Sequence, residues 1–321
     1  MNILMFGRGV IATQYGWALE QAGSKVEFYV RPGRAAEYGP SVELDILDGR
    51  KSSKGAPVNV SWPITMREEI PPDHSYDLII VSVNHEQLGP VIKAVASWAG
   101  NATILMFNNI WDDMQNIIAP LPKEQVVWGF PGGGGGYAGK TLHAGFVKSI
   151  FLQSADTAAS QKRHQQVAGL FEQAGFRLSI QKDMRSWYWD HFLLDAALGA
   201  QMFREGSYER MFRSRAAVKE AVLVMQEILP IIERRGGTPL ASSKMMMRLP
   251  AGLIAFALYK VIGGDGLMGE IMRRMEASSH VSKDTQSRFP KDVLATARQL
   301  GMPLPRLEAL EPYFASKTES E

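Results

Sequence analysis

Short apolar runs alternate with longer stretches of helical spacing through the first half of the chain. The apolar runs are bounded by turn or polar residues and lie at Asn2–Phe6, Lys25–Val30, Leu78–Val83, Thr103–Phe107 and Val126–Phe130. Between them lie segments long enough for helices, such as Val10–Ala22 and Glu86–Ala99. Strands that are apolar on both faces and alternate with helices are typical of a parallel sheet covered on both sides.

The pattern changes after about Lys182. Before it, Lys148–Leu152, Ala158–Ala174 and Arg177–Ile180 complete the strand–helix alternation. After it, helix formers dominate, and we expect helices over Met184–Arg204, Tyr208–Arg235, Leu249–Val261, Asp265–Ser278 and Pro290–Leu300. We therefore predict an α/β chain with a doubly wound parallel sheet in residues 1–181 and an all-helical C-terminal domain in residues 182–321, ending in a frayed acidic tail after Phe314.

Composition narrows the class of protein. The chain has 321 residues, of which 45% are hydrophobic and 21% charged, which is typical of a globular protein. A formal net charge of +2 argues against binding to nucleic acid or to an anionic membrane. The absence of cysteine excludes disulfides, thiolate metal sites and a cysteine nucleophile. Because no basic segment precedes the first apolar run, and the longest apolar stretch is too short to span a bilayer, we expect a cytoplasmic protein.

A glycine-rich turn directly follows the first predicted strand. It fits the dinucleotide-binding fingerprint, with alanine at the last position, and reads Gly7-Arg8-Gly9-Val10-Ile11-Ala12. The first glycine makes the tight turn, the second lets the backbone approach a pyrophosphate, and the helix N-terminus faces the phosphates. The alternative is a glycine turn without a ligand. In this strand–turn–helix context we interpret it as the cofactor site of a Rossmann-like domain.

The end of the second strand indicates which dinucleotide binds. An NAD site usually has an acidic residue about 20 residues after the glycines, to bind the ribose hydroxyls. Here the strand ends in Tyr29-Val30-Arg31-Pro32-Gly33-Arg34, without a carboxylate. The guanidinium of Arg31 is suited to a 2′-phosphate, and Arg34 is placed to assist it. The alternative is a solvated surface arginine; the phosphate role predicts NADP.

These residues resemble the ketopantoate reductases (2-dehydropantoate 2-reductases), whose fold is a Rossmann domain followed by a helical domain. The resemblance includes the glycine turn with Arg31, the strand Asp77–Val83, the segment Phe107-Asn108-Asn109 and the stretch Leu300–Pro305. It implies that Asn108 touches both cofactor and substrate. It also places Val83 and Asn84 at the cofactor, because ligands bind at the carboxyl ends of strands in open sheets.

The departures from the family affect the substrate site. Asn84 stands where the family carries a lysine. His191 replaces the family's general-acid lysine, and Asp195 replaces the asparagine four residues later. Of the family's substrate motif only Ser278 and Ser279 match. The resemblance therefore implies a divergent member that keeps the cofactor site and has a rebuilt substrate site.

His191 is the candidate proton donor for carbonyl reduction, which needs a hydride and a proton. Trp187, His191 and Asp195 recur at a spacing of four and share one face of the predicted helix. Asp195 is placed to orient the imidazole and to favour its protonated form. The alternative interpretation is a histidine packed between the domains.

Other candidates are weaker. His85 either contacts the cofactor or starts a helix. The run Gly132–Gly136 either borders the nicotinamide with its amides or is a flexible loop, and we expect the loop. No histidine–carboxylate spacing indicates a metal. Exposed-looking apolar residues at Met245–Met247 and Leu253–Leu258 indicate core or a homodimer interface.

The sequence thus favours an NADPH-dependent reductase of a small 2-oxo acid or related carbonyl, acting in a cleft between domains. One alternative is a catalytically silent NADP-binding sensor, which the loss of the family lysine favours. Another is an opine- or imine-type reductase with the same two domains.

Overall fold

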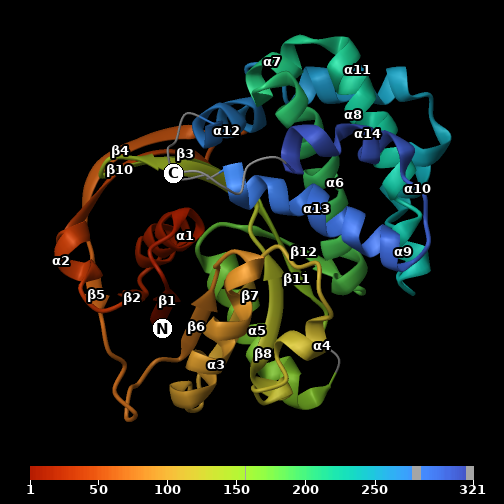
Figure 1. Ribbon diagram of the computed structural model, residues 1–321. Helices are drawn as coiled ribbons and strands as arrows, with labels where there is room; N and C mark the ends of the chain where they lie inside the picture. The colour runs from red at the N-terminus through yellow and green to blue at the C-terminus, as the bar shows by residue number, and fades with distance from the viewer. Residues whose placement is uncertain (156, 277–282, 316–321) are drawn as a thin grey trace. The chain divides into compact units, whose positions relative to one another are not determined.

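The computed structural model describes residues 1–155, 157–276 and 283–315 of the chain. These residues form two compact units (Figure 1): Met1–Met184 make up the first, and the second begins at Arg185. The first unit holds the described strands, and the second is helical. The predicted fold class, a mixed α/β region with a parallel sheet followed by a helical region, is confirmed.

An eight-stranded sheet forms the centre of the first unit, in the order β12-β11-β8-β7-β6-β1-β2-β5. Its strands are β1 (Asn2–Phe6), β2 (Lys25–Tyr29), β5 (Thr65–Arg67), β6 (Leu78–Val81), β7 (Thr103–Phe107), β8 (Val126–Phe130), β11 (Ser149–Gln153) and β12 (Arg177–Gln181). Neighbours run parallel except β8 and β11. The chain runs from β1 to β2 on one side and to β6 on the other, so the carboxyl ends of β1 and β6 border a topological switch point.

Helices connect these strands. They are α1 (Val10–Glu20), α2 (Arg34–Tyr38), α3 (Leu88–Trp98), α4 (Met114–Ile117) and α5 (Ala158–Gln173), with the 3₁₀ segments η1 (His85–Gln87) and η2 (Lys123–Gln125). Strands β6 and β7 are buried along their whole length, as their continuous apolar sequence predicts for strands covered on both faces.

A second sheet was not predicted. It has four strands in the order β4-β3-β10-β9, namely β3 (Ser41–Gly49), β4 (Ala56–Pro63), β9 (Gly133–Ala138) and β10 (Thr141–Val147). The expectation of a flexible loop at Gly132–Gly136 is therefore wrong, because most of this run is strand β9, paired antiparallel with β10. A Cβ on Gly133 would lie 2.6 Å from the carbonyl oxygen of Gly145, so glycine permits this close pairing. A glycine run has neither alternation nor strand propensity, which is why the pattern gave no strand signal.

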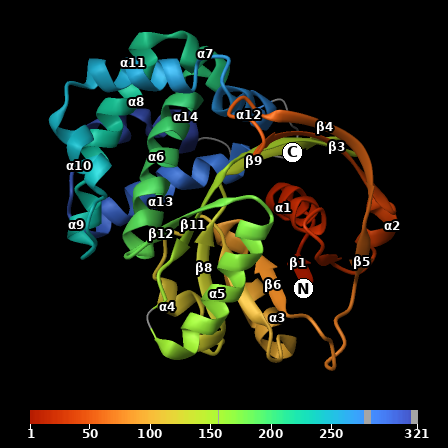
Figure 2. The same ribbon diagram turned by 180° about the vertical axis from the view of Figure 1, so that it is seen from behind.

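Helix α1 lies between the two sheets, beneath the curved strands of the second one (Figures 1 and 2). Tyr15 and Trp17 of α1 belong to one core with Phe28 of the main sheet and with Leu44 and Phe146 of the second sheet. The helix that follows the glycine turn is therefore held from both sides.

The second unit consists of helices. They are α6 (Met184–Glu205), α7 (Tyr208–Arg213), α8 (Arg215–Ile228), α9 (Ile231–Arg234), α10 (Ala241–Arg248), α11 (Ala251–Val261), α12 (Leu267–Glu276), α13 (Lys283–Gln299) and α14 (Pro305–Ala315). The stretch predicted as helical over Tyr208–Arg235 is divided into three helices. Ser214 caps α8 by accepting the amide of Ala217, and Pro230 precedes α9. Helices α10 and α14 were not predicted, and the acidic tail from residue 316 on lies outside the described residues.

Candidate functional site

The glycine turn joins the carboxyl end of β1 to the N-terminus of α1. Gly7 has a φ of 86°, in the left-handed region that glycine tolerates, and its amide donates to the carbonyl of Tyr29 at 2.9 Å. Gly9 is the N-cap residue, and no side chain caps the helix. Within the first turn, Val10 and Ile11 are half-buried and Ala12 is buried. The uncapped amides at this N-terminus are donors of the kind that bind phosphate.

Arg8, in the middle of this turn, lies between two tyrosine rings. Its guanidinium carbon is 4.6 Å from the ring centroid of Tyr38 and 4.8 Å from that of Tyr137. Tyr137, on β9, is fixed in turn by a 2.7 Å hydrogen bond between its hydroxyl and that of Thr13 on α1. The Nε of Arg8 is buried and has no hydrogen-bond partner. Neither tyrosine was predicted as part of the site, and Tyr137 could not be, because the second sheet that supplies it was not predicted.

The arginines after β2 are at the surface. Arg31 is exposed, and its side chain makes no hydrogen bond or ion pair with the part of the chain that the structure describes. Arg34 is held by Glu37 at 2.5 Å and by the Tyr38 hydroxyl at 3.1 Å, with its guanidinium carbon 4.9 Å from the Tyr38 ring centroid. Tyr38 thus contacts both Arg8 and Arg34, while Arg31 lies in the chain two residues after the end of β2.

Glu27 is the acidic residue nearest the spacing expected of an NAD site, and its carboxylate is fully engaged. It accepts hydrogen bonds from Arg67 at 2.9 Å and from the Tyr76 hydroxyl at 2.7 Å, and pairs with Lys25 at 3.1 Å. The hydrogen bond from Arg67 is the main cause that lowers the pKa of Glu27 to about 2, with further contributions from Tyr76 and Lys25. Glu27 is buried, so its carboxylate ties β2 to its neighbours and does not face a ribose.

The carboxyl ends of β6 and β7 bring three predicted residues together. The Nδ2 of Asn108 donates to the carbonyl of Val83 at 2.5 Å, while its Oδ1 is buried without a partner. Asn84 is exposed and precedes η1. Its backbone N–H donates a hydrogen bond to the Oε1 of Gln87 at 3.3 Å. His85 begins η1, so the helix-start interpretation is confirmed. Ser82, which was not predicted, has a buried hydroxyl without a partner.

The residues at these strand ends fit a dinucleotide. Buried polar groups in proteins are almost always hydrogen-bonded, yet three unpaired ones lie at the ends of β1, β6 and β7: Arg8 Nε, Ser82 Oγ and Asn108 Oδ1. Together with the uncapped N-terminus of α1 they offer donors and an acceptor to phosphates, hydroxyls and an amide.

Of the predicted catalytic residues, His191 and Asp195 lie on α6, and Asn108 lies in the first unit. The Nε2 of His191 is 3.6 Å from the Oδ2 of Asp195, and both side chains are about one-third exposed. The His191 ring stacks on Trp187 with centroids 5.3 Å apart and planes 6° from parallel. The structure therefore brings together the three residues whose spacing placed them on one helix face. Ser278 and Ser279 lie outside the described residues.

Asp190, beside His191, has a structural role. It is buried, and its carboxylate accepts one hydrogen bond from the backbone N–H of Leu240 at 2.8 Å and another from the hydroxyl of Ser243. Burial raises the pKa of this carboxyl, and the hydrogen bonds from Ser243 and Leu240 oppose that effect. It anchors the start of α10.

No cluster of three or more histidine and acidic side chains among the described residues has the arrangement of a metal site. None of the described helices is long and apolar enough to span a membrane.

The strand order, the switch point and the glycine turn that opens α1 define the first unit as a Rossmann-type α/β domain. Residues 3–154 match the family model described as ketopantoate reductase PanE/ApbA, so this part of the chain is similar to that family. None of the curated proteins compared with the chain matches it.

Solved structures share the fold over nearly the whole chain. A PanE/ApbA family ketopantoate reductase from Ralstonia eutropha JMP134 is 17% identical, with a TM-score of 0.68, over 98% of this chain and 97% of that one. D-mandelate dehydrogenase with NADH and anilino(oxo)acetate is 14% identical, with a TM-score of 0.73, over 98% of this chain and 97% of that one. Dimeric ketopantoate reductase from Staphylococcus aureus is 11% identical, with a TM-score of 0.66, over 99% of this chain and 100% of that one.

Proposed function

We propose that the protein is an NADPH-dependent reductase of a small 2-oxo acid or related carbonyl. The observation that carries the proposal is the glycine turn, with its uncapped helix and the unpaired polar atoms beside it. The match of residues 3–154 to the ketopantoate reductase family model supports it. Two relatives of the same fold, a D-mandelate dehydrogenase holding NADH with an oxo acid and the ketopantoate reductases, support a 2-oxo acid as substrate.

The choice of NADP rests on charge. Arg31 and Arg34 follow β2, and Arg8 contacts Tyr38 of the same segment. Of these three arginines only Arg34 is paired with a carboxylate among the described residues. Glu27 is already bound by Arg67 and Tyr76 and offers no oxygen to a ribose. An unpaired guanidinium favours a 2′-phosphate through charge-assisted hydrogen bonds.

In the proposed reaction the bound nicotinamide supplies the hydride. His191 donates the proton to the oxygen of the substrate carbonyl as negative charge develops there. Asp195, 3.6 Å from the imidazole, is a positioning residue that orients the ring. Asn108, already fixed by Val83, holds cofactor and substrate through its unpaired Oδ1. In this proposal residues 1–181 bind NADP, and residues 182–321 bind the substrate.

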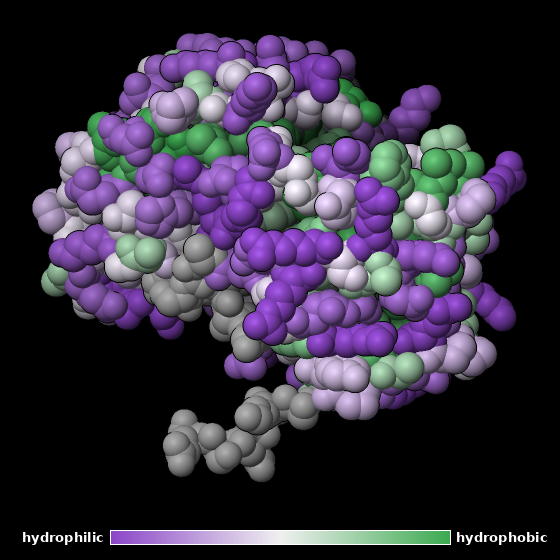
Figure 3. Space-filling model, turned by 90° about the horizontal axis from the view of Figure 1, so that it is seen from above, coloured by the Kyte–Doolittle hydropathy of each residue, from purple (hydrophilic) through white to green (hydrophobic). Residues whose placement is uncertain are grey.

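We also propose a homodimer formed by the helical region. Helices α10 and α11 expose large apolar side chains, among them Met245 at 60%, Leu253 at 56% and Val261 at 57% of their surface. Figure 3 shows hydrophobic side chains reaching the surface between polar ones. Exposed apolar groups of this size commonly mark interfaces, and the related enzyme from Staphylococcus aureus is dimeric.

Cofactor binding tests the proposal. Arg31→Ala should weaken NADPH binding by roughly ten- to a hundred-fold and leave NADH binding nearly unchanged, because only NADPH has the 2′-phosphate. Gly9→Val should abolish binding of both, since a side chain there occupies the place of the pyrophosphate. Fluorescence titration with each dinucleotide measures both effects, and equal losses for NADPH and NADH in Arg31→Ala would show that Arg31 is structural.

A silent NADP-binding sensor is the second candidate, and the replacement of the family lysine by His191 favours it. Turnover with a panel of 2-oxo acids, aldehydes and imines separates the two functions. Tight NADPH binding without NADPH oxidation on any substrate would support the sensor, and oxidation only with imines would support an opine- or imine-type reductase.

A further inference from the structure

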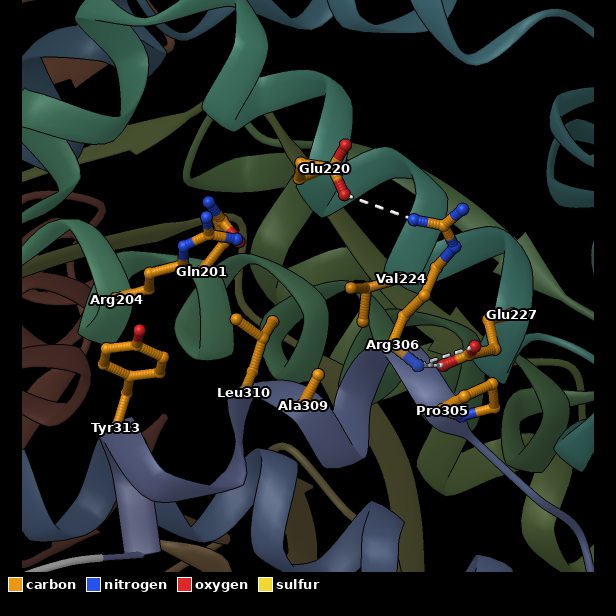
Figure 4. A pocket seen from close by; sticks show the side chains of 10 residues that line it. All are labelled: Gln201, Arg204, Glu220, Val224, Glu227, Pro305, Arg306, Ala309, Leu310 and Tyr313. Carbon is orange, nitrogen blue, oxygen red and sulfur yellow. Dashed lines mark hydrogen bonds and ion pairs between the residues drawn. The ribbon is translucent and has the colours of Figure 1, made fainter.

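A pocket of about 580 Å³ lies between α6, α8 and α14 of the second unit (Figure 4). Gln201 and Arg204 of α6 form one wall, with Tyr313 of α14 beside them, and Arg306 lies on the opposite side. None of the residues proposed to bind NADP or to donate the proton lines it. The volume is in the range of small-molecule sites.

Gln201 leaves a hydrogen-bond acceptor unused at this wall. Its residue surface is 1% exposed, and its Nε2 donates to the Oε1 of Glu205 at 3.0 Å. Because a carboxylate only accepts, the amide nitrogen must face Glu205, so the other amide atom is the oxygen. This Oε1 is buried and has no partner. A ligand with an O–H or N–H group would satisfy it.

Two arginines and two glutamates line the pocket, and Arg204 is the one of these arginines without an ion pair among the described residues. Arg306 pairs with Glu220 at 3.2 Å. The carboxylate of Glu227 accepts hydrogen bonds from the backbone N–H groups of Arg306 and Leu307, at 2.9 and 3.0 Å, at the N-terminus of α14. Arg204 is exposed, and its guanidinium makes no ion pair or hydrogen bond with residues that the structure describes. The pocket therefore favours an anionic group beside Arg204.

The rest of the lining is aliphatic, with Val224, Ala309 and Leu310 between the two polar walls. An anion at Arg204, a donor beside it at Gln201 and a short apolar body that extends toward Val224 and Leu310 define the ligand. We infer that this pocket binds a short aliphatic carboxylate with a hydroxyl or amino group on its α-carbon. The site is separate from the proposed reductase site and does not depend on it.

Isothermal titration of the full-length protein with four probes tests the inference. The probes are 2-hydroxyisovalerate and valine, which have both groups, isovalerate, which lacks the donor, and 2-hydroxyisovaleramide, which lacks the charge. Saturable binding of 2-hydroxyisovalerate or valine is expected, at least ten-fold tighter than binding of the other two. Which of these two probes binds tells whether the natural ligand is a hydroxy acid or an amino acid.

Variants locate the binding. Arg204→Gln and Gln201→Leu should each weaken it by ten-fold or more, and Arg210→Gln, a surface change on α7, should not. Arg204 is exposed, so its variant is expected to fold, and thermal melting checks both variants. NADPH affinity should be the same in all of them, which separates this result from a failure of the reductase proposal. No saturable binding of any probe, or binding that survives both variants, would overturn the inference.

Discussion

His191 carries the chemical part of the proposal at the scale of a single residue. Its imidazole is stacked on Trp187 and faces Asp195 across 3.6 Å, and it remains about one-third exposed. A residue that only packs in a core is usually buried further. The partial exposure leaves room for a substrate oxygen beside the imidazole, and Asp195 is close enough to orient the ring.

Replacing His191 by alanine should cost roughly a hundred- to ten-thousand-fold in turnover, the usual contribution of a positioned acid, and leave NADPH affinity unchanged. Steady-state kinetics and NADPH titration measure both effects. Near-wild-type turnover of His191→Ala would assign the proton to another group, and loss of folding in a melting curve would make His191 structural.

The sequence could predict the role of a residue where the evidence lay in the spacing of residues within one segment, and could not where it lay in contacts with distant segments. The glycine turn and the face shared by Trp187, His191 and Asp195 are set by spacing within one segment, and the structure places them as expected. The partners of Arg8 could not be predicted, because Tyr137 joins Thr13 across 124 residues of sequence. Ser82 gave no signal either, since its significance lies in a hydroxyl that burial leaves unpaired.

Strand β9 shows at the scale of an element why a glycine run need not be a loop. Gly133→Ala should destabilise the protein by about 1–3 kcal/mol, the usual cost of overpacking, because the new Cβ would lie 2.6 Å from the carbonyl oxygen of Gly145. Urea unfolding measures the loss. Gly169→Ala on α5 is the matched control, since nothing lies within 4 Å of its added Cβ. Equal stabilities for the two variants would mean that β9 can move away from β10.

Strand β5 is joined to β2 by the Glu27–Arg67 pair as well as by backbone pairing. The folded-state pKa of Glu27 is about 2, below its ordinary value of 4.5, so its contribution is complete above about pH 4.5 and is lost as the pH falls toward 2. A difference of this size corresponds to about 3 kcal/mol at neutral pH.

Glu27→Gln should therefore lower the free energy of unfolding most at neutral pH, and the gap to the wild type should close as the pH falls from about 4.5 to 2. Denaturant unfolding at several pH values measures this gap. Glu209→Gln, which breaks an exposed pair with Arg213, is the control and should show almost no gap at any pH. If the difference in unfolding free energy between Glu27→Gln and the wild type did not depend on pH, the Glu27–Arg67 pair would not be what lowers the pKa of Glu27.

Assembly is the question at the scale of the whole molecule. If α10 and α11 form the dimer interface, light scattering at micromolar concentration should give twice the 35.5 kDa of the chain. Leu253→Glu should give a monomer, because a charge cannot be buried unpaired in an apolar interface. Val60→Glu on β4, where the valine is 43% exposed, should leave the dimer intact. A monomeric wild type would end the proposal.

At this scale the sequence predicted the α/β class and the change to helices, because continuous apolar runs and helical spacing are strong signals over many residues. It missed the second sheet, whose strands β3 and β10 pair although they are far apart in the chain. It also missed α10, which begins where the buried carboxylate of Asp190 accepts the amide of Leu240. Both features depend on tertiary partners that a local pattern does not contain.

The hydrogen bond between Thr13 and Tyr137 has a consequence for how this domain can be exchanged or copied. The glycine turn is often treated as a unit of one strand, one turn and one helix that can be transferred between proteins. Here a graft of residues 2–38 would carry Arg8 and Tyr38 into a new host but would leave Tyr137 behind. A chimaera that is meant to keep the cofactor preference would have to include the hairpin of β9 and β10 as well, so the smallest transferable part is discontinuous in sequence.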